Sequence, residues 1–209
     1  MSAPNILFDG AKNADYIICL AHGAGAPMDS TFMQATAEGL AKRGLRVARF
    51  EFPYMADRRL MQIKKPPNRT PVLLETWNKA IAELDFPSSR LFIGGKSLGG
   101  RMASMVADET GVAGLVCLGY PFHSPGKLAS PDRLEHLGSL KTPTLICQGT
   151  RDPFGRPEEV SGYNLSSQIL VHWLTDGDHN LKPRKKSDRT AEQNLEEALD
   201  AILKFTREI

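Results

Sequence analysis

Short apolar runs alternate with longer amphipathic stretches along most of the chain. The runs share a continuous hydrophobicity of about five residues, which is typical of strands covered on both faces; they lie at 16–20, 46–50, 90–94, 114–118, 144–148 and 169–173, with a weaker one at 5–8. Between them, apolar residues at helical spacing predict helices at 30–43, 71–84, 98–110 and 190–207. Ser30 and Thr190 are the expected N-caps, and Gly44 and Gly111 the expected stops.

This alternation predicts an α/β fold with a mostly parallel central sheet of about six to seven strands and helices on both faces. Three stretches, 53–69, 120–141 and 176–188, predict neither helix nor strand. Each follows a predicted strand, so all three should meet at the carboxyl edge of the sheet, where open α/β folds bind ligands. Because 120–141 is too short for a large cap domain, we expect residues 1–209 to form one domain without a cap.

Composition narrows the class of protein. The chain is 41% hydrophobic and 24% charged, which favours a globular fold, and its formal net charge of +2 gives no overall field for nucleic acid or an anionic membrane. No leader pattern and no membrane-length apolar run is present, so a cytoplasmic protein is expected. The three cysteines lie inside apolar runs without paired spacing, which argues against disulfides and a zinc site. We expect no metal and no cofactor.

Candidate chemistry begins at Gly95-Lys96-Ser97-Leu98-Gly99, which follows a predicted strand and opens a predicted helix. That context is the one a nucleophile elbow requires. The glycines are predicted to prevent collisions with neighbouring backbone while Ser97 is held in a strained, exposed conformation. The amide of Leu98 would then face the oxygen that becomes negative during attack.

A second glycine-rich turn, His22-Gly23-Ala24-Gly25, follows the strand at 16–20. A turn at this place supplies the other donor of an oxyanion hole, and we expect the N–H of Ala24 or its neighbour to do so. The alternative is a turn that serves tight packing only.

An acid and a histidine follow further along the chain. Asp152 leaves the strand at 144–148, and His179 follows the strand at 169–173. A serine hydroxyl needs a base to take its proton, so His179 is the predicted general base and Asp152 the acid that orients it. Asp176 and Asp178 are alternative acids, but both are close in sequence to His179. Among the other histidines, His172 lies within a predicted strand, His22 in the oxyanion turn and His136 in a loop stretch. His123 follows a predicted strand at the active edge and is either structural or a substrate contact.

With these residues in hand, the chain resembles the α/β-hydrolase superfamily over nearly its full length. It is most similar to the small uncapped branch related to dienelactone hydrolases and to the testis-expressed protein thirty group. The segments that carry the resemblance include His22-Gly23-Ala24-Gly25, Gly94 to Arg101, Gly119 to His123, Gln148 to Gly155, and Gly177-Asp178-His179. The order serine, acid, histidine agrees with that superfamily. The resemblance implies a carboxylester or related acyl hydrolase.

Two departures limit what the resemblance implies. Dienelactone hydrolases use a cysteine nucleophile where this chain has Ser97, so their chemistry does not carry over. Lys96 stands where esterases often have His, Tyr or Phe; we favour its pairing with an acidic neighbour over a contact with substrate.

Basic residues are frequent in two of the active-edge loops: Arg58, Arg59, Lys64, Lys65 and Arg69 in the first, and Lys182, Arg184, Lys185 and Lys186 in the last. They either receive an anionic ester or thioester or form a solvated loop face. The substrate-binding candidates are His22, Gly23, Gly25, Lys96, His123, Arg58 and Lys182.

The sequence therefore predicts a serine hydrolase acting on a small-molecule ester or thioester, as a monomer or homodimer, with no nucleic-acid or membrane partner. A catalytically silent hydrolase-like binding or scaffold protein is the alternative, because a fold alone does not fix function.

Overall fold

One seven-stranded sheet forms the centre of the molecule, seen in a computed structural model that describes residues 3–127 and 130–209. Its strands, in chain order, are β1 Ile6–Asp9, β2 Ile17–Ala21, β3 Arg46–Phe50, β4 Leu91–Lys96, β5 Gly114–Leu118, β6 Thr144–Gly149 and β7 Ile169–Leu174. All seven predicted strands are present. Every residue of β2, β4, β5 and β6 is buried, which confirms that continuous hydrophobicity marks strands covered on both faces.

The strands lie in the order β1-β3-β2-β4-β5-β6-β7. Only β1, which pairs with β3, runs antiparallel among the described strands. The chain builds outward from β2 to β3 on one side and then from β4 to β7 on the other, so the order reverses between β2 and β4. Ligands of open α/β sheets bind at such a reversal, beyond the carboxyl ends of the strands.

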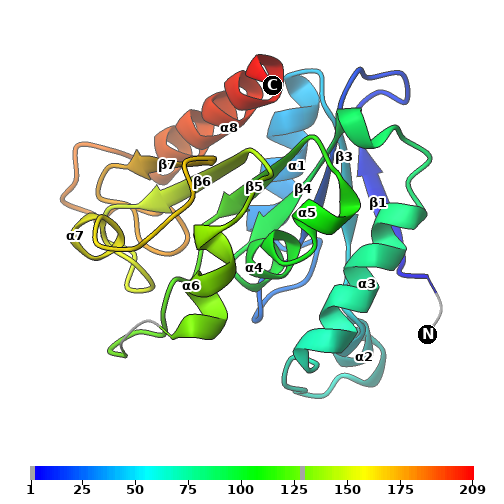
Figure 1. Cartoon of the computed structure of the whole chain (residues 1–209), viewed down its shortest axis with the longest axis horizontal. Helices are drawn as coiled ribbons and strands as arrows, with labels where there is room; N and C mark the ends of the chain where they lie inside the picture. Colours follow the sequence, from blue (N-terminus) through cyan, green and yellow to red (C-terminus); the bar gives the residue numbers. More distant parts are fainter. Residues whose placement is uncertain (1–2, 128–129) are drawn as a thin grey trace.

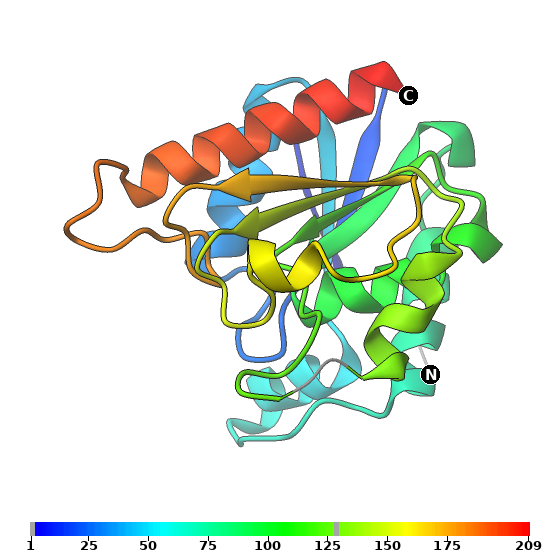
Figure 2. The same cartoon turned by 60° about the vertical axis from the view of Figure 1, so that its left-hand side comes forward.

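Helices cover both faces of this sheet (Figure 1). One face packs on α1 Thr31–Lys42 and α8 Ala191–Glu208, through Met33, Leu40 and Leu199 among others. The other face packs on α3 Thr70–Ala82, α4 Leu98–Ser104, α5 Ala107–Thr110 and α6 Pro131–Gly138. Figure 2 shows α8 lying along one face and α6 on the opposite one. The chain therefore has the predicted fold, an uncapped α/β sandwich.

The helix at 98–110 was predicted to be continuous, and this prediction is wrong. Helix α4 ends at Ser104 and α5 begins at Ala107. Between them, Met105 N–H donates to the carbonyl of Met102 and Val106 N–H to that of Ala103, so the turn tightens to i→i−3 bonds. Val106 is buried, and the apolar pattern therefore runs through the break.

Two stretches expected to lack regular structure contain short helices: α2 Pro53–Met61 in 53–69, and α6 in 120–141. Both begin at a proline, which is suited to the first turn of a helix. In α2 only Tyr54 and Met55 are buried, so the periodic signal is weak. A further short helix, α7 Pro157–Val160, was also not predicted, and residues 88–90 form a 3₁₀ turn.

The predicted caps have different outcomes. Thr190 forms a capping box with Gln193: the Thr190 hydroxyl accepts from Gln193 N–H at 3.1 Å, and the Gln193 side chain accepts from Thr190 N–H at 2.9 Å. Ser30 precedes α1 as predicted, but its side chain makes no cap bond. Gly44 and Gly111 follow their helices with φ of 93° and 62°. Within the described ranges, every helix falls short of the length or apolar character that crossing a bilayer requires.

Candidate active site

Ser97 alone makes the turn between β4 and α4. Its backbone adopts φ 49° and ψ −111°, a conformation that side chains rarely tolerate. A Cβ on Gly95 would lie 2.0 Å from the carbonyl oxygen of Ala21, and one on Gly99 would lie 2.3 Å from the same oxygen. Both separations are far inside van der Waals contact, so the predicted steric role of these glycines is confirmed.

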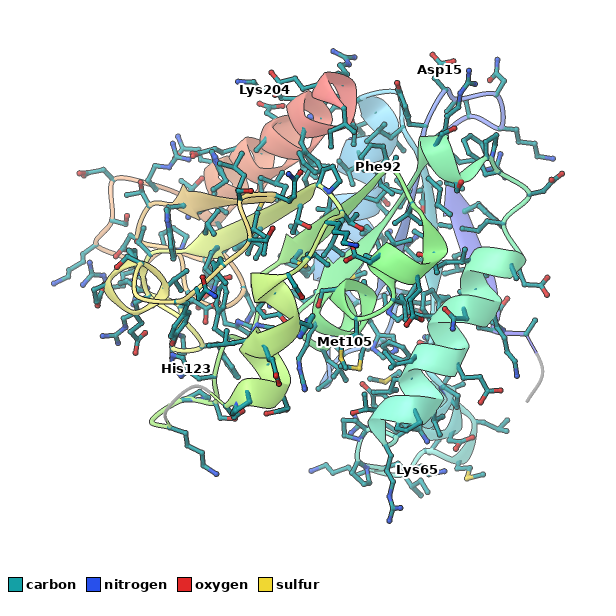
Figure 3. All side chains as sticks on the ribbon, viewed as in Figure 1. Asp15, Lys65, Phe92, Met105, His123 and Lys204 are labelled. Atoms are coloured by element: carbon teal, nitrogen blue, oxygen red, sulfur yellow. The ribbon has the colours of Figure 1, made fainter. Side chains whose placement is uncertain are left out.

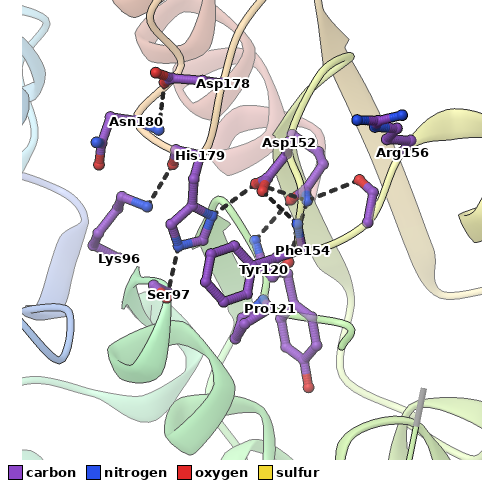
Figure 4. Close-up of polar contacts among 12 residues, drawn as sticks. Lys96, Ser97, Tyr120, Pro121, Asp152, Phe154, Arg156, Asp178, His179 and Asn180 are labelled. Carbon is purple, nitrogen blue, oxygen red and sulfur yellow. Dashed lines mark hydrogen bonds and ion pairs between the residues drawn. The ribbon is translucent and has the colours of Figure 1, made fainter. Parts of the chain in front are cut away.

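The side chains of Ser97, His179 and Asp152 form one chain of hydrogen bonds (Figure 4). The Nε2 of His179 lies 2.9 Å from Ser97 Oγ, and its Nδ1 lies 2.8 Å from Asp152 Oδ2. The three residues come from the ends of β4, β6 and β7, which are separate in sequence. The structure thus brings together the three side chains predicted to act together.

Asp152 is fully buried, and protein donors hold its carboxylate in place. Besides His179, it accepts from Phe154 N–H at Oδ1, at 2.9 Å, and from Gln148 Nε2 at Oδ2, at 3.0 Å. The alternative acids are occupied elsewhere: Asp176 pairs with Arg151 and Arg184, and Asp178 accepts from backbone N–H groups of its own turn.

Burial has the largest effect on the imidazole of His179 and lowers its pKa below the ordinary value. The hydrogen bond that His179 donates to Asp152 raises that pKa, and the nearby positive charge of Lys96 lowers it. The ring also stacks on Phe154, with centroids 4.2 Å apart and an interplanar angle of 30°. The net direction favours a neutral imidazole at neutral pH, which is the form that accepts a proton.

The glycine-rich turn after β2 is held from behind by α2. Tyr54 Oη donates to the carbonyl oxygen of Gly23 at 3.2 Å, and Arg58 Nη1 donates to that of Ala24, also at 3.2 Å. In a trans peptide the N–H points away from the carbonyl of the same plane, so the N–H groups of Ala24 and Gly25 point away from α2. Neither Ala24 N–H nor Leu98 N–H has an acceptor within residues 3–127 and 130–209.

His22 supports this turn and does not line the pocket. Phe52 N–H donates to His22 Nε2 at 3.1 Å, so the proton of the neutral ring is on Nδ1, which donates to Gly23 O at 2.7 Å. The side chain is fully buried between these partners. Its predicted contact with substrate is therefore corrected to a contact with the backbone of the turn.

A pocket of about 280 Å³ opens over Ser97. Most of its wall is apolar or backbone, and its lining comprises Gly23, Ala24, Gly25, Ala26, Ser30, Phe32, Met33, Lys96, Ser97, Phe154, His179 and Asn180. Gly23, Gly25 and Lys96, which were predicted to contact substrate, are part of this lining. Phe32, Met33, Phe154 and Asn180 were not predicted, because only the folded chain brings their segments to the same wall.

His123, Arg58 and Lys182 do not line this pocket. His123 is buried on the loop after β5 (Figure 3), where its Nδ1 bonds Ser124 O at 3.0 Å and its Nε2 lies 3.4 Å from Glu159. Arg58 is used in holding Ala24 and the carbonyl of Lys65. Lys182 is exposed, and only its backbone bonds to Asp178. A contact of these three residues with substrate stays a prediction.

Three of the other basic residues of these loops form ion pairs within the fold. Arg59 pairs with Asp29 and Glu51, Lys65 with Asp57, and Arg184 with Asp176. Lys96 was expected to pair with an acidic neighbour, and that expectation is wrong: no ion pair joins it to a described residue, and its ammonium instead donates to a backbone carbonyl.

The remaining histidines have structural partners. His172 Nε2 lies 3.2 Å from Glu197, and His136 Nε2 lies 2.8 Å from the Ser104 hydroxyl. Among the described residues, no group of three or more His, Cys, Asp or Glu side chains could hold a metal ion.

An uncapped, mostly parallel sheet with a strained serine after its central strand defines the class of α/β hydrolases. The sequence matches the alpha/beta hydrolase domain family over residues 14–207, and the chain belongs to that family. The finer resemblance to dienelactone hydrolases and the testis-expressed protein thirty group stays a prediction.

Solved structures share this fold at low sequence identity. Est1E from Butyrivibrio proteoclasticus with ferulic acid bound is 15% identical, with a TM-score of 0.69 over 98% of this chain and 96% of that one. An alpha-beta serine hydrolase homologue from Coxiella burnetii is 18% identical, with a TM-score of 0.68 over 98% and 90%. The thioesterase domain from the curacin biosynthetic pathway is 14% identical, with a TM-score of 0.66 over 98% and 94%. A search of curated proteins gives no significant match.

Proposed function

We propose that the protein is a serine hydrolase that cleaves carboxylic esters or thioesters through an acyl-enzyme. The observation that carries the proposal is the continuous hydrogen-bonded chain from Asp152 through His179 to Ser97, at the floor of an open pocket. A binding or scaffold protein has no chemical need for a buried carboxylate aligned with an imidazole and a strained serine.

In the first half of the reaction, Ser97 Oγ attacks the carbonyl carbon while His179 Nε2 takes the hydroxyl proton. The carbonyl oxygen becomes an oxyanion, and the unpaired N–H groups of Ala24 and Leu98 stabilise it. Asp152 stabilises the imidazolium through Nδ1. His179 then gives its proton to the departing alkoxide or thiolate, which leaves Ser97 acylated.

The second half repeats these steps with water in place of the serine. His179 takes a proton from water, the hydroxide attacks the acyl carbon, and Ser97 recovers its proton as the carboxylic acid leaves. Each step moves one proton through Nε2, so no cofactor enters the proposed cycle.

The pocket favours a small apolar group on the substrate, because Phe32, Met33, Phe154 and two alanines contribute to its wall. An anionic ester stays a second hypothesis, but the pairing of Arg59, Lys65 and Arg184 within the fold weakens it. If the rates on matched anionic and neutral esters respond identically to ionic strength, the anionic hypothesis fails.

Labelling with a fluorophosphonate tests the function, since this reagent needs an activated serine. We expect one adduct, on the peptide that contains Ser97, and no adduct in Ser97→Ala or His179→Ala. Ser167→Ala, which removes an exposed hydroxyl remote from the pocket, is the matched control and should label like the wild type. An unlabelled, folded wild-type protein would support the silent scaffold instead.

A further inference from the structure

Lys96, the residue before Ser97, is a buried lysine. It ends β4, and only 7% of its surface is exposed. Its Nζ donates to the main-chain carbonyl oxygen of His179 at 2.5 Å (Figure 4). A buried ammonium is costly, so a fold that retains one beside its serine requires a physical reason.

The surroundings of Lys96 direct its ammonium towards His179. Its stem passes Gly23, where a Cβ would lie 3.4 Å from Lys96 Cγ. At the other end, a Cβ on Gly119 would lie 2.9 Å from Nζ and 2.8 Å from His179 O. Gly119 has φ 69°, so both its backbone conformation and this crowding require glycine there. The end of β5 thus leaves a slot for the contact between Lys96 and His179.

Two consecutive residues therefore hold His179 at two places. Ser97 Oγ bonds the ring at Nε2, and Lys96 Nζ bonds the main chain. We propose that Lys96 is a positioning residue of the hydrolase: its ammonium fixes the loop that carries His179 and places a positive charge beside the imidazole. This inference rests on the proposed function of Ser97 and His179.

The charged groups around Lys96 and His179 determine in which direction Lys96 shifts the pKa of the imidazole. The charged groups that act on His179 are Lys96 from β4, Asp152 from the loop after β6, and Asp178 from its own loop; of these only Lys96 lowers the pKa of the imidazole. Burial lowers the pKa of Lys96 itself to about 8, against the opposing effects of Asp152 and Asp178. Lys96 is consequently charged over the range in which His179 titrates.

Lys96→Met tests this role because it keeps the length of the stem and removes the charge and the donor. We expect the acidic limb of kcat/KM to move up by about one pH unit, since a neighbouring unit charge in a protein shifts a pKa on that scale. We also expect kcat to fall about tenfold through misplacement of His179, with KM changed less than threefold. Lys96→Gln also removes the charge and should move the acidic limb of kcat/KM in the same direction. It replaces Lys96→Met in the test if the Met variant does not fold.

Lys204→Met is the matched control. Lys204 lies on α8 with 74% of its side chain exposed (Figure 3). Lys204→Met changes the net charge as much as Lys96→Met does, and it should leave the acidic limb of kcat/KM in place. NMR titration of the His179 ring, assigned by the signal lost in His179→Asn, gives the same pKa without turnover. Equal His179 pKa values in wild type and Lys96→Met overturn the inference about Lys96. An inactive, unlabelled wild type overturns the proposed function instead, and the titration still reports on the charge.

Discussion

Asp152→Asn tests the proton logic of the site while hardly changing its volume. The two carboxylate oxygens face different donors: Oδ2 receives His179 Nδ1 and Gln148 Nε2, and Oδ1 receives Phe154 N–H. An asparagine has one oxygen and one NH₂ group to put in these two places.

The structure decides between the two orientations. With its oxygen at the Oδ2 place, the asparagine turns NH₂ towards Phe154 N–H, and this buried conflict between donors costs about 1–3 kcal/mol. With its oxygen at the Oδ1 place, it keeps the Phe154 bond. Gln148 Nε2 then retains Tyr120 O and Gly155 O, each at 3.2 Å, so it tolerates the loss of one acceptor. The second orientation is therefore favoured, and His179 accepts from NH₂ at Nδ1.

An imidazole that accepts at Nδ1 has its proton on Nε2 and cannot take the proton of Ser97. We expect kcat/KM to fall by about 10⁴, which is about 5.5 kcal/mol of transition-state stabilisation. The thermal midpoint should change by less than about 4 °C, since no buried donor of the backbone loses its partner.

The assay is hydrolysis of p-nitrophenyl acetate, with the thermal midpoint followed by circular dichroism. Asp178→Asn removes a neighbouring carboxylate and should cost less than tenfold, because an amide oxygen still accepts from the Asn180 and Lys182 N–H groups. A folded Asp152→Asn protein with activity within tenfold of the wild type would show that Asp152 does not set the tautomer of His179.

Three further predictions concern the site and the fold. Burial lowers the pKa of His179, so kcat/KM of the wild type should hold from neutral pH down to below about pH 6.5 and fall as His179 gains a proton; a midpoint above 7 contradicts this. Gly99→Ala puts a Cβ 2.3 Å from Ala21 O, and we expect a loss of about 1–3 kcal/mol in the free energy of unfolding, measured by urea denaturation, where an unchanged value would be contrary. Thr190→Ala removes the capping bond to Gln193 and should cost about 1 kcal/mol, or about 2–4 °C in thermal midpoint; no change would show that the cap is not stabilising.

The sheet could be predicted because its strands are buried on both faces, and such strands have an unbroken apolar pattern. The β1 edge strand was weaker in sequence because it is only partly buried. Helix breaks were harder to predict: the turn at Met105 and Val106 depends on local i→i−3 bonds that the apolar pattern does not record. In α2, two buried residues were too few to reveal the helix.

In the site, too, some features could be predicted from the sequence and others depend on contacts made only in the folded chain. Ser97, Asp152 and His179 follow from strand ends and motifs, since parallel strands bring their carboxyl ends to one edge. The roles of His22 and Lys96 could not be predicted, because each depends on which backbone carbonyl lies within reach of its nitrogen in the folded chain. Basic loops suggested an anion site, but the acidic partners of Arg59 and Arg184 become adjacent only on folding.

Trapping the acyl-enzyme identifies the side chain that attacks the ester. The protein is mixed with p-nitrophenyl butyrate, quenched in acid within the first turnover, digested and analysed by mass spectrometry. We expect one butyryl group, attached to Ser97, which disappears as the reaction ends. Turnover of the ester with the acyl group on another residue, or unchanged turnover in Ser97→Ala, would contradict this expectation.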